Sequence, residues 1–387
     1  MKANVAWSTD ENAFLAGKNS AKKAVLDLIQ TKVAFIFSSV KYDAQKLVEG
    51  AKEELGTAPI IGCTSNGGIL VPDGFITSEN GFVGIMAIGD PDTAVGVAGS
   101  PKMLTARETG RKVAMEAMNK VGTTFSPAYF FMIANPGEEE EYAKGIQDVI
   151  GDVPMFGGSC ADDDLSGKWK IFTGDKVFSE GVAVAFFYTN KKLVNEYTGK
   201  YHETVNSGII TEIEGKRTLK EINNVPAMKQ YAEWTGFKTR NLMGDKILTA
   251  SILKPLGVKT PTGNVTLIRH PMAGNSDYSI NVGNDLAVNT AIIQMQASLD
   301  ELVNAPRLAL RNLKSKLSSE PAGYLLVHCG GRKIAIGDRI DDVAKLVKEE
   351  AGDVPFIMPF TFGEYGRAEH EANNMGGLML SETAFCK

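Results

Sequence analysis

Three of the four cysteines in this 387-residue chain lie in glycine-rich settings where a thiol could act as a nucleophile. Cys63 stands in "GCTSNGG", Cys160 in "GGSCADDD" and Cys329 in "VHCGGR". Catalysis by a thiol requires a base within reach and a lowered pKa. His328 precedes Cys329, but adjacent residues of a strand point to opposite faces, so the base would have to be His270 or His370, from a distant part of the chain. Small buried thiols are the simpler interpretation, and cysteine-based catalysis is the alternative.

The first two of these glycine-rich loops could instead form the wall of a ligand pocket. Glycines let backbone amides approach an anionic group, and hydroxyl and amide side chains add donors and acceptors. Alternatively, the glycines only allow close packing of strands and helices. The three aspartates that end the second loop repel one another, so they either form a solvated turn at the pocket rim, which we expect, or are partly neutralised by a cation. The loop residues that we predict to line a pocket are Cys63, Thr64, Ser65, Asn66, Gly157, Gly158, Ser159, Cys160 and Asp162.

Charged residues in the last third of the chain supply a second set of candidates. Arg269 lies in the apolar stretch "LIRH", where a cation needs a carboxylate partner or a ligand anion. Arg332 and Glu364 follow expected strands and could form a structural ion pair. Otherwise they could bind the carboxylate and the ammonium of a zwitterion such as an amino acid. We therefore add Arg269, Cys329, Arg332, Glu364 and Tyr365 to the predicted ligand site.

Composition excludes several classes of partner. The formal net charge is -5 and basic residues form no block, so the field of the protein would repel a nucleic acid. No apolar run approaches the roughly 18 residues of a membrane span, and the N-terminus does not resemble a secretion signal. The four cysteines form no C-x-x-C pair and the four histidines no H-x-x-x-H pair, so we expect neither a metal nor a cofactor. A cytoplasmic location with reduced thiols is expected.

One local pattern occurs three times along the chain. "GTAPIIGCTSNGG", "GDVPMFGGSCADD" and "GDVPFIMPFTFGE" each begin with Gly-x-x-Pro and continue with apolar residues. A glycine C-cap and a following proline predict that a helix ends at each copy. The expected helices, which are amphipathic, span 42–55, 138–150 and 341–351. The expected flanking strands span 32–40, 81–89, 128–134, 181–188, 322–330 and 376–383.

These elements predict an α/β (α+β) protein built from repeated β-α-β-β units, with mixed sheets flanked by helices. Strands that are apolar on both faces must be covered twice, which favours a layered α-β-β-α arrangement. The stretch 263–297 is typical of a strand meander, and 299–317 of a helix. Composition turns polar over 189–208, so we expect two domains, residues 1–200 and 201–387.

The motifs "IIGCTSNGGI", "MFGGSCADDD", "VHCGGR" and "FTFGEYG" together resemble the FIST family over about residues 25–383. The resemblance assigns a FIST N-type domain to the first half and a FIST C-type domain to the second. It aligns the family's loops with 62–65 and 157–159, its Cys-to-Arg motif with Cys329 and Arg332, and its Gly-Glu motif with Glu364. Pro359 stands where the family usually has glycine, and proline removes a backbone donor, so the pocket there is expected to be reshaped.

What the resemblance implies is a sensory protein that binds a small polar metabolite, such as an amino acid, in a pocket between the two halves. No signalling output module follows the second half, so three alternatives stay open: a stand-alone sensor, a receptor that depends on a separate signalling protein as its partner, or a solute-binding protein that presents its ligand to another protein. The chain is expected not to be an enzyme. The alternative is a cysteine-dependent hydrolase or acyl-transferring enzyme, in which one thiol would have a strongly lowered pKa.

Overall fold

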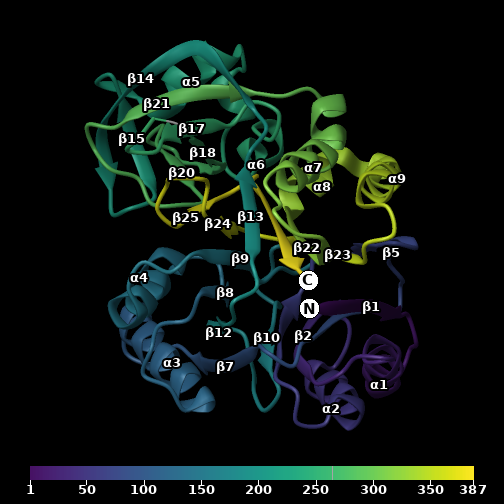
Figure 1. The fold of residues 1–387 in the computed structure, drawn as a ribbon. Helices are drawn as coiled ribbons and strands as arrows, with labels where there is room; N and C mark the ends of the chain where they lie inside the picture. Colours follow the sequence, from purple (N-terminus) through teal and green to yellow (C-terminus); the bar gives the residue numbers. More distant parts are fainter. Residues whose placement is uncertain (264) are drawn as a thin grey trace.

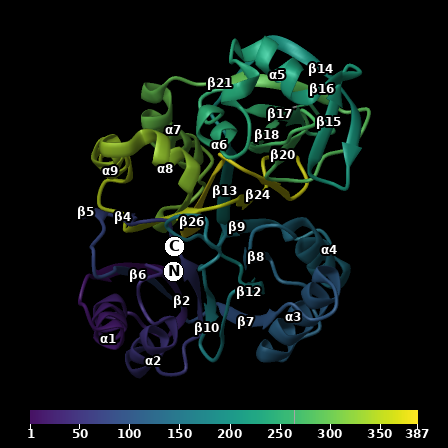
Figure 2. The ribbon, with the colours of Figure 1, turned by 180° about the vertical axis from the view of Figure 1, so that it is seen from behind.

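The computed structural model describes residues 1–263 and 265–387, so one residue of the expected meander, 264, lies outside the described residues. It shows the expected α/β class, with mixed sheets flanked by helices. None of the described helices is long and apolar enough to cross a lipid bilayer. In two opposite views the N- and C-termini lie beside each other near the middle of the molecule (Figures 1 and 2).

Three six-stranded sheets make up most of the fold (Figure 1). Sheet I contains, in spatial order, β1 (Lys2–Ser8), β6 (Val83–Gly89), β2 (Thr31–Ser38), β3 (Ile60–Thr64), β10 (Ile171–Thr173) and β11 (Val177–Phe178). Sheet II contains β25 (Asn374–Gly376), β24 (Glu364–Gly366), β9 (Met155–Ser159), β8 (Tyr129–Ala134), β12 (Gly181–Tyr188) and β7 (Ala94–Pro101). Sheet III contains β13 (Leu193–Thr198), β26 (Leu380–Cys386), β22 (Pro321–Cys329), β23 (Phe356–Thr361), β4 (Ile69–Val71) and β5 (Gly74–Ile76).

The sheets are three copies of one topological unit, which confirms the repeat predicted from the sequence. In sheet I, β2 is parallel to β3 and antiparallel to β6, which pairs in turn with β1. Strands β8, β9, β12 and β7 have the same relations in sheet II, and β22, β23, β26 and β13 have them in sheet III. We call these the first, second and third units.

Each unit contributes a β-hairpin to the sheet of a neighbouring unit. The β4–β5 hairpin of the first unit pairs with β23 of the third, and β10–β11 of the second pairs with β3 of the first. The β24–β25 hairpin of the third unit pairs with β9 of the second. The exchange is cyclic, and it covers the strand that would otherwise be an open edge in every unit.

The inner faces of the three sheets share one apolar core. Phe35 from sheet I, Phe131 from sheet II and Phe385 from sheet III belong to it. The ring centroids of Phe35 and Phe131 are 4.9 Å apart, and those of Phe35 and Phe385 are 5.8 Å apart. Burying one such ring stabilises the fold by about 1.5–3 kcal/mol, so this junction strongly favours a single assembled core.

Helices cover the outer faces of the three sheets, whose inner faces meet in the shared core. Helices α1 and α2 pack on sheet I, α3 and α4 on sheet II, and α7 and α9 on sheet III. Glycines with positive φ end α2, α4 and α9, as the sequence predicted. The bounds are α1 (Ala13–Ala24), α2 (Ala44–Leu55), α3 (Ala106–Val121), α4 (Glu139–Ile150), α7 (Leu299–Ser315), α8 (Gly330–Ile336) and α9 (Ile340–Ala351).

An antiparallel β domain, residues 202–296, is inserted in the third unit between β13 and α7, and we call it the cap. It lies at one end of the molecule, and the first two units lie at the other (Figures 1 and 2). Its strands are β18 (Thr266–Arg269), β17 (Leu256–Lys259), β21 (Ala291–Gln296), β14 (His202–Glu214), β15 (Thr218–Ile222), β20 (Ile280–Val282), β19 (Pro271–Gly274) and β16 (Val225–Pro226). Its helices are α5 (Ala227–Thr235) and α6 (Lys246–Ala250).

Candidate functional site

A cavity of about 310 Å³ lies where the cap meets the second and third units. Its lower wall consists of segments that follow β8, β9, β22 and β23, and its upper wall consists of cap residues. Ligands of α/β proteins gather at such carboxyl ends of strands. Most of the wall is apolar, from Leu165, Trp169, Leu248, Met272, Val282, Ile334 and Phe362. The polar side chains of the wall are Glu139, Arg217, His270, Asn284 and Cys329.

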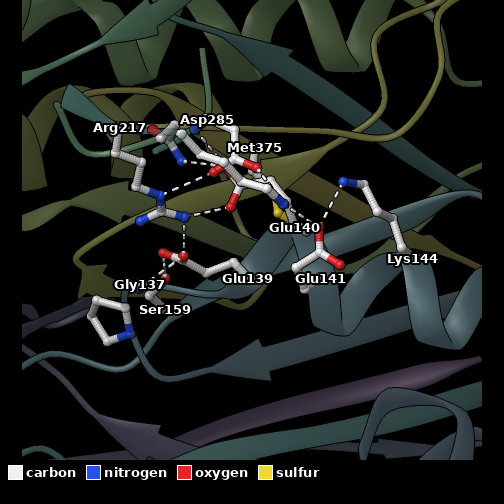
Figure 3. Close-up of polar contacts among 12 residues, drawn as sticks. Gly137, Glu139, Glu140, Glu141, Lys144, Ser159, Arg217, Asp285 and Met375 are labelled. Carbon is white, nitrogen blue, oxygen red and sulfur yellow. Dashed lines mark hydrogen bonds and ion pairs between the residues drawn. The ribbon is translucent and has the colours of Figure 1, made fainter. Parts of the chain in front are cut away.

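Glu139, in the first turn of α4, is held in place at the edge of this cavity (Figure 3). Its side chain is almost fully buried, and its Oε2 accepts hydrogen bonds from the Gly137 amide at 2.9 Å and from Arg217 Nη2 at 2.7 Å. Ser159 Oγ donates to Oε1 at 3.1 Å and lies 2.6 Å from the Tyr365 hydroxyl. Burial raises the pKa of Glu139, and the positive charge of Arg217 opposes that rise.

Arg217 reaches this carboxylate from the cap, where it precedes β15. Its Nε donates to Asp285 at 3.2 Å, and its Nη2 contacts Glu140 as well as Glu139. Its Nη1 makes no hydrogen bond to any residue that the structure describes, and the side chain remains 21% exposed at the cavity. Burial alone would raise the pKa of Glu140, but Arg217 and the Asp285 amide outweigh it and lower that pKa. One guanidinium nitrogen, with its two N–H donors, thus remains free for an anion.

Asn284, which lines the cavity, has an unsatisfied hydrogen-bond acceptor, its side-chain oxygen Oδ1. The residue is 2% exposed, and its Oδ1 has no hydrogen-bond partner among the described residues. Its Nδ2 donates to Glu140 Oε1 at 3.3 Å, and because a carboxylate accepts a donor only, this contact fixes which amide atom is the oxygen. A buried acceptor without a partner lowers the stability of the folded protein by about 1–3 kcal/mol. A ligand that donates a hydrogen bond to Oδ1 would remove this cost.

Cys329 is the one member of the predicted site that lines the cavity directly. Burial raises the pKa of its thiol, and the carboxyl of Glu364 adds to the rise. His270 lies nearby, since a methyl group placed on Gly331 would be 3.6 Å from Cys329 Sγ and 3.7 Å from His270 Cε1. Burial lowers the pKa of His270 to about 4, and its Nε2 lies 2.8 Å from the Leu248 carbonyl. A neutral thiol beside a neutral imidazole does not form the ion pair that activates a cysteine.

Arg332 and Glu364 are buried behind Cys329 rather than in the cavity wall. No salt bridge joins them in the described part of the chain. Glu364 accepts hydrogen bonds from Thr361 Oγ1 and from the Met379 amide, each at 2.9 Å. Burial raises its pKa to about 8. Arg332 Nη1 donates to the carbonyls of Gly199 at 2.6 Å and Leu378 at 3.1 Å.

Arg269 is also buried away from the cavity. Its guanidinium donates to three backbone carbonyls, those of Ile268, Asp285 and Met375. Burial lowers the pKa of this side chain, although the charge of Glu140 opposes the change. The arginine therefore ties β18 to β25 and to the turn at 284–285, which positions Asn284 indirectly.

The residues of the two glycine-rich loops mainly join the three units to one another. A backbone amide at the equivalent position of each repeat donates to a backbone carbonyl of another unit, so the three hydrogen bonds link the units in a closed ring. They run from Asn66 to Phe360 at 2.9 Å, from Ala161 to Thr64 at 3.0 Å and from Phe362 to Ser159 at 3.3 Å. The Ser65 hydroxyl donates to the Gly68 carbonyl within the first loop, and the side-chain Nδ2 of Asn66 donates to the Asp162 carbonyl of the second loop. Cys63 and Cys160 belong to the central core, and Gly157 and Gly158 lie against neighbouring backbone.

The aspartate turn differs from the expectation of a solvated rim. Asp162 is fully buried, and its carboxylate accepts the amides of Leu165 at 2.6 Å and Lys168 at 2.8 Å. Only Asp163 and Asp164 are exposed. The buried carboxylate is balanced by these amides, which shape the loop that brings Leu165 and Trp169 to the cavity.

The sequence pointed to His270 as a possible base for a cysteine, but not to Glu139, Arg217 or Asn284, which also line the cavity. The run "PGEEEE" at 136–141 was a signal, because four adjacent carboxylates at a helix start require cations nearby. Arg217 and Asn284 stand in ordinary turn sequences and gave no signal.

Comparison with known proteins identifies two family models that meet near the start of α5. Residues 32–225 match the FIST N domain, and residues 227–367 match the FIST C domain. The expected domain boundary at residues 200–201 lies before the boundary between the two family models, at the start of the cap. No curated protein matches the chain.

Among solved structures, PurLQS from Thermotoga maritima is 8% identical, with a TM-score of 0.25, and the match covers 100% of this chain and 72% of that one. T. maritima PurL complexed with AMPPCP is 9% identical, with a TM-score of 0.23, over 99% and 73% of the two chains. Scores this low support no argument about fold or function.

Proposed function

Because this chain belongs to the FIST family, we propose that it is a sensory protein that binds a small metabolite in the cavity beneath the cap. FIST domains are generally sensory, ligand-binding domains of signal transduction. The observation that carries the proposal is the unmet Asn284 acceptor, which faces a cavity that also holds a free Arg217 donor and the Glu139 carboxylate. An apolar cavity with a few converging polar groups between domains is the usual form of a small-molecule site.

We propose an amino acid with an apolar side chain as the ligand class. Its ammonium would donate to Asn284 Oδ1 and Glu139, and its carboxylate would accept from Arg217 Nη1. Such charge-assisted hydrogen bonds are about twice as strong as neutral ones. The apolar side chain would pack on Trp169, Phe362 and the aliphatic residues of the wall.

Thermal unfolding with added L-leucine, L-isoleucine, L-methionine and L-phenylalanine tests this proposal. A ligand that binds only the folded state raises the Tm by mass action. The matched analogues are the amine without the carboxylate and the acid without the ammonium, and we expect both to bind on the order of tenfold or more weakly. No shift with any amino acid at millimolar concentration would contradict the amino acid assignment.

Variants at the polar end show whether a shift comes from this cavity. Arg217→Ala should weaken binding on the order of tenfold to a hundredfold, because it removes a charged donor. Arg339→Ala is the matched control, since Arg339 also pairs with two carboxylates, Asp300 and Asp342, but on the exposed surface. If Arg217→Ala binds the ligand as tightly as Arg339→Ala does, the ligand binds elsewhere.

We propose that a separate signalling protein detects the ligand-bound state. We also propose a cytoplasmic location, because all four cysteines are free. The cysteine-dependent alternative receives less support, since burial of Cys329 disfavours its thiolate.

A further inference from the structure

The cap is attached to the rest of the molecule unequally on its two sides. Both of its chain connections belong to the third unit, because it leaves from β13 and returns into α7. Its apolar core is continuous with that of the third unit: Ile210 and Leu256 of the cap belong to the same cluster as Leu310 and Tyr324. On this side the cap is held covalently and by a buried apolar contact.

Toward the second unit, the cap is held by polar side chains. Three consecutive glutamates in the first turn of α4 meet two turns of the cap, and we call this contact the clasp (Figure 3). Arg217 binds Glu139 and Glu140, and Lys216 binds Glu141 at 2.5 Å. The Asp285 amide donates to Glu140 Oε1 at 3.1 Å. The clasp consists of Glu139, Glu140, Glu141, Lys216, Arg217, Asn284 and Asp285.

The clasp is a reversible kind of contact. Lys216 and Glu141 are partly exposed, so water and salt screen their attraction, and such pairs contribute little. Its carboxylates come from Glu139, Glu140, Glu141 and Asp285, against the cations of Lys216 and Arg217 with Lys144 beside Glu141. The Arg217 pairs with Glu139 and Glu140 are more buried, so they supply most of the attraction across the clasp. An apolar contact on one side and a polar, acid-rich contact on the other favour rotation about the first.

We propose that residues 202–296 form a lid that is hinged on the third unit and fastened to the second unit by the clasp. Opening the clasp separates Arg217 and Asn284 from Glu139 and so exposes the cavity. Control of the lid by a ligand rests on the proposed function. A ligand ammonium between Asn284 and Glu139 adds a positive charge to the acid-rich clasp and so stabilises the closed lid. A downstream protein would then distinguish the open lid from the closed one.

Distances between spin labels on the unliganded protein test the lid. One pair, at Glu212→Cys and Lys120→Cys, spans the clasp from the cap to α3. The other, at Glu212→Cys and Lys345→Cys, spans the hinge side from the cap to α9. The replaced residues are exposed, whereas the four native cysteines are buried and should not react with the label. Each pair is measured with the clasp intact and with Lys216→Ala and Arg217→Ala together.

The clasp variant should increase the ratio of open to closed lid on the order of tenfold, seen as a longer and broader distance across the clasp. The hinge-side distance should stay narrow. The matched control is Arg311→Ala with Lys314→Ala, which removes an arginine and a lysine that both bind Glu350 within the third unit. It should change neither distance.

An unchanged clasp distance in the variant would overturn the lid, and so would equal broadening of both distances, which would mean that the whole cap is loosened. If the double variant fails to fold, Lys216→Gln with Arg217→Gln, which removes both positive charges but keeps polar side chains, takes its place, with the same outcomes. These measurements need no ligand, so a protein that binds no amino acid can still show the lid, and one that binds can still lack it.

Discussion

Replacing Asn284 by leucine separates a binding role from a structural one, because the two roles predict opposite changes in stability. The Oδ1 atom is buried without a described partner, and removing it recovers about 1–3 kcal/mol. The Nδ2 contact with Glu140 is long, at 3.3 Å, and its loss costs about 1 kcal/mol, since Glu140 keeps Arg217 and the Asp285 amide. Leucine has a similar volume, so little is gained or lost in packing.

The expected net change in the free energy of unfolding therefore lies between about 0 and about +2 kcal/mol in favour of the variant. Stabilisation on removal of a polar group is typical of residues kept for function. The unliganded variant should show a Tm no lower than wild type in thermal unfolding, and the shift caused by an amino acid should disappear.

Asn135→Leu is the matched control, because Asn135 is also buried but uses both ends of its amide. Its Oδ1 accepts the Gly181 amide at 2.8 Å, and its Nδ2 donates to the Pro136 carbonyl at 2.9 Å. Loss of these contacts leaves the Gly181 amide and the Pro136 carbonyl without a hydrogen-bond partner and should lower the free energy of unfolding by about 2–4 kcal/mol. If Asn284→Leu lowers the Tm as much as Asn135→Leu does, Asn284 is a structural residue and the reasoning is refuted.

Two further predictions concern buried titratable groups. The pKa of Glu364 is raised to about 8, so the folded protein keeps a proton that the unfolded chain loses above about pH 4.5, and this contribution to stability falls as the pH rises from about 4.5 to 8. The Tm of wild type should therefore decline relative to that of Glu364→Gln across this window, and a constant difference between the two would contradict the raised pKa. Burial raises the pKa of Cys63, Cys160 and Cys329, so iodoacetamide at neutral pH should modify these thiols much more slowly in the folded protein than in guanidinium chloride. Rapid alkylation of Cys329 alone would revive the cysteine-dependent alternative.

Most of the repeated framework could be predicted from local sequence. Amphipathic spacing, a glycine C-cap and a following proline placed α2, α4 and α9 within two residues of their observed ends. Apolar runs located β2, β8 and β22 in the same way. The last expected strand, 376–383, was displaced from β26 (Leu380–Cys386), because the apolar residues at its start are buried in a loop before the strand.

The sequence by itself determined the three units and the family, since helix ends and strand runs are encoded by residues close together in the chain. Only the tertiary structure decided which side chains meet in the cavity. Glu139 and Asn284 are separated by 145 positions, and the run of glutamates that contains Glu139 does not indicate which residues of the cap lie opposite it. They line the same cavity because the cap folds back from the third unit onto the second, and an arrangement that depends on the closure of so long a loop leaves no local pattern in the sequence.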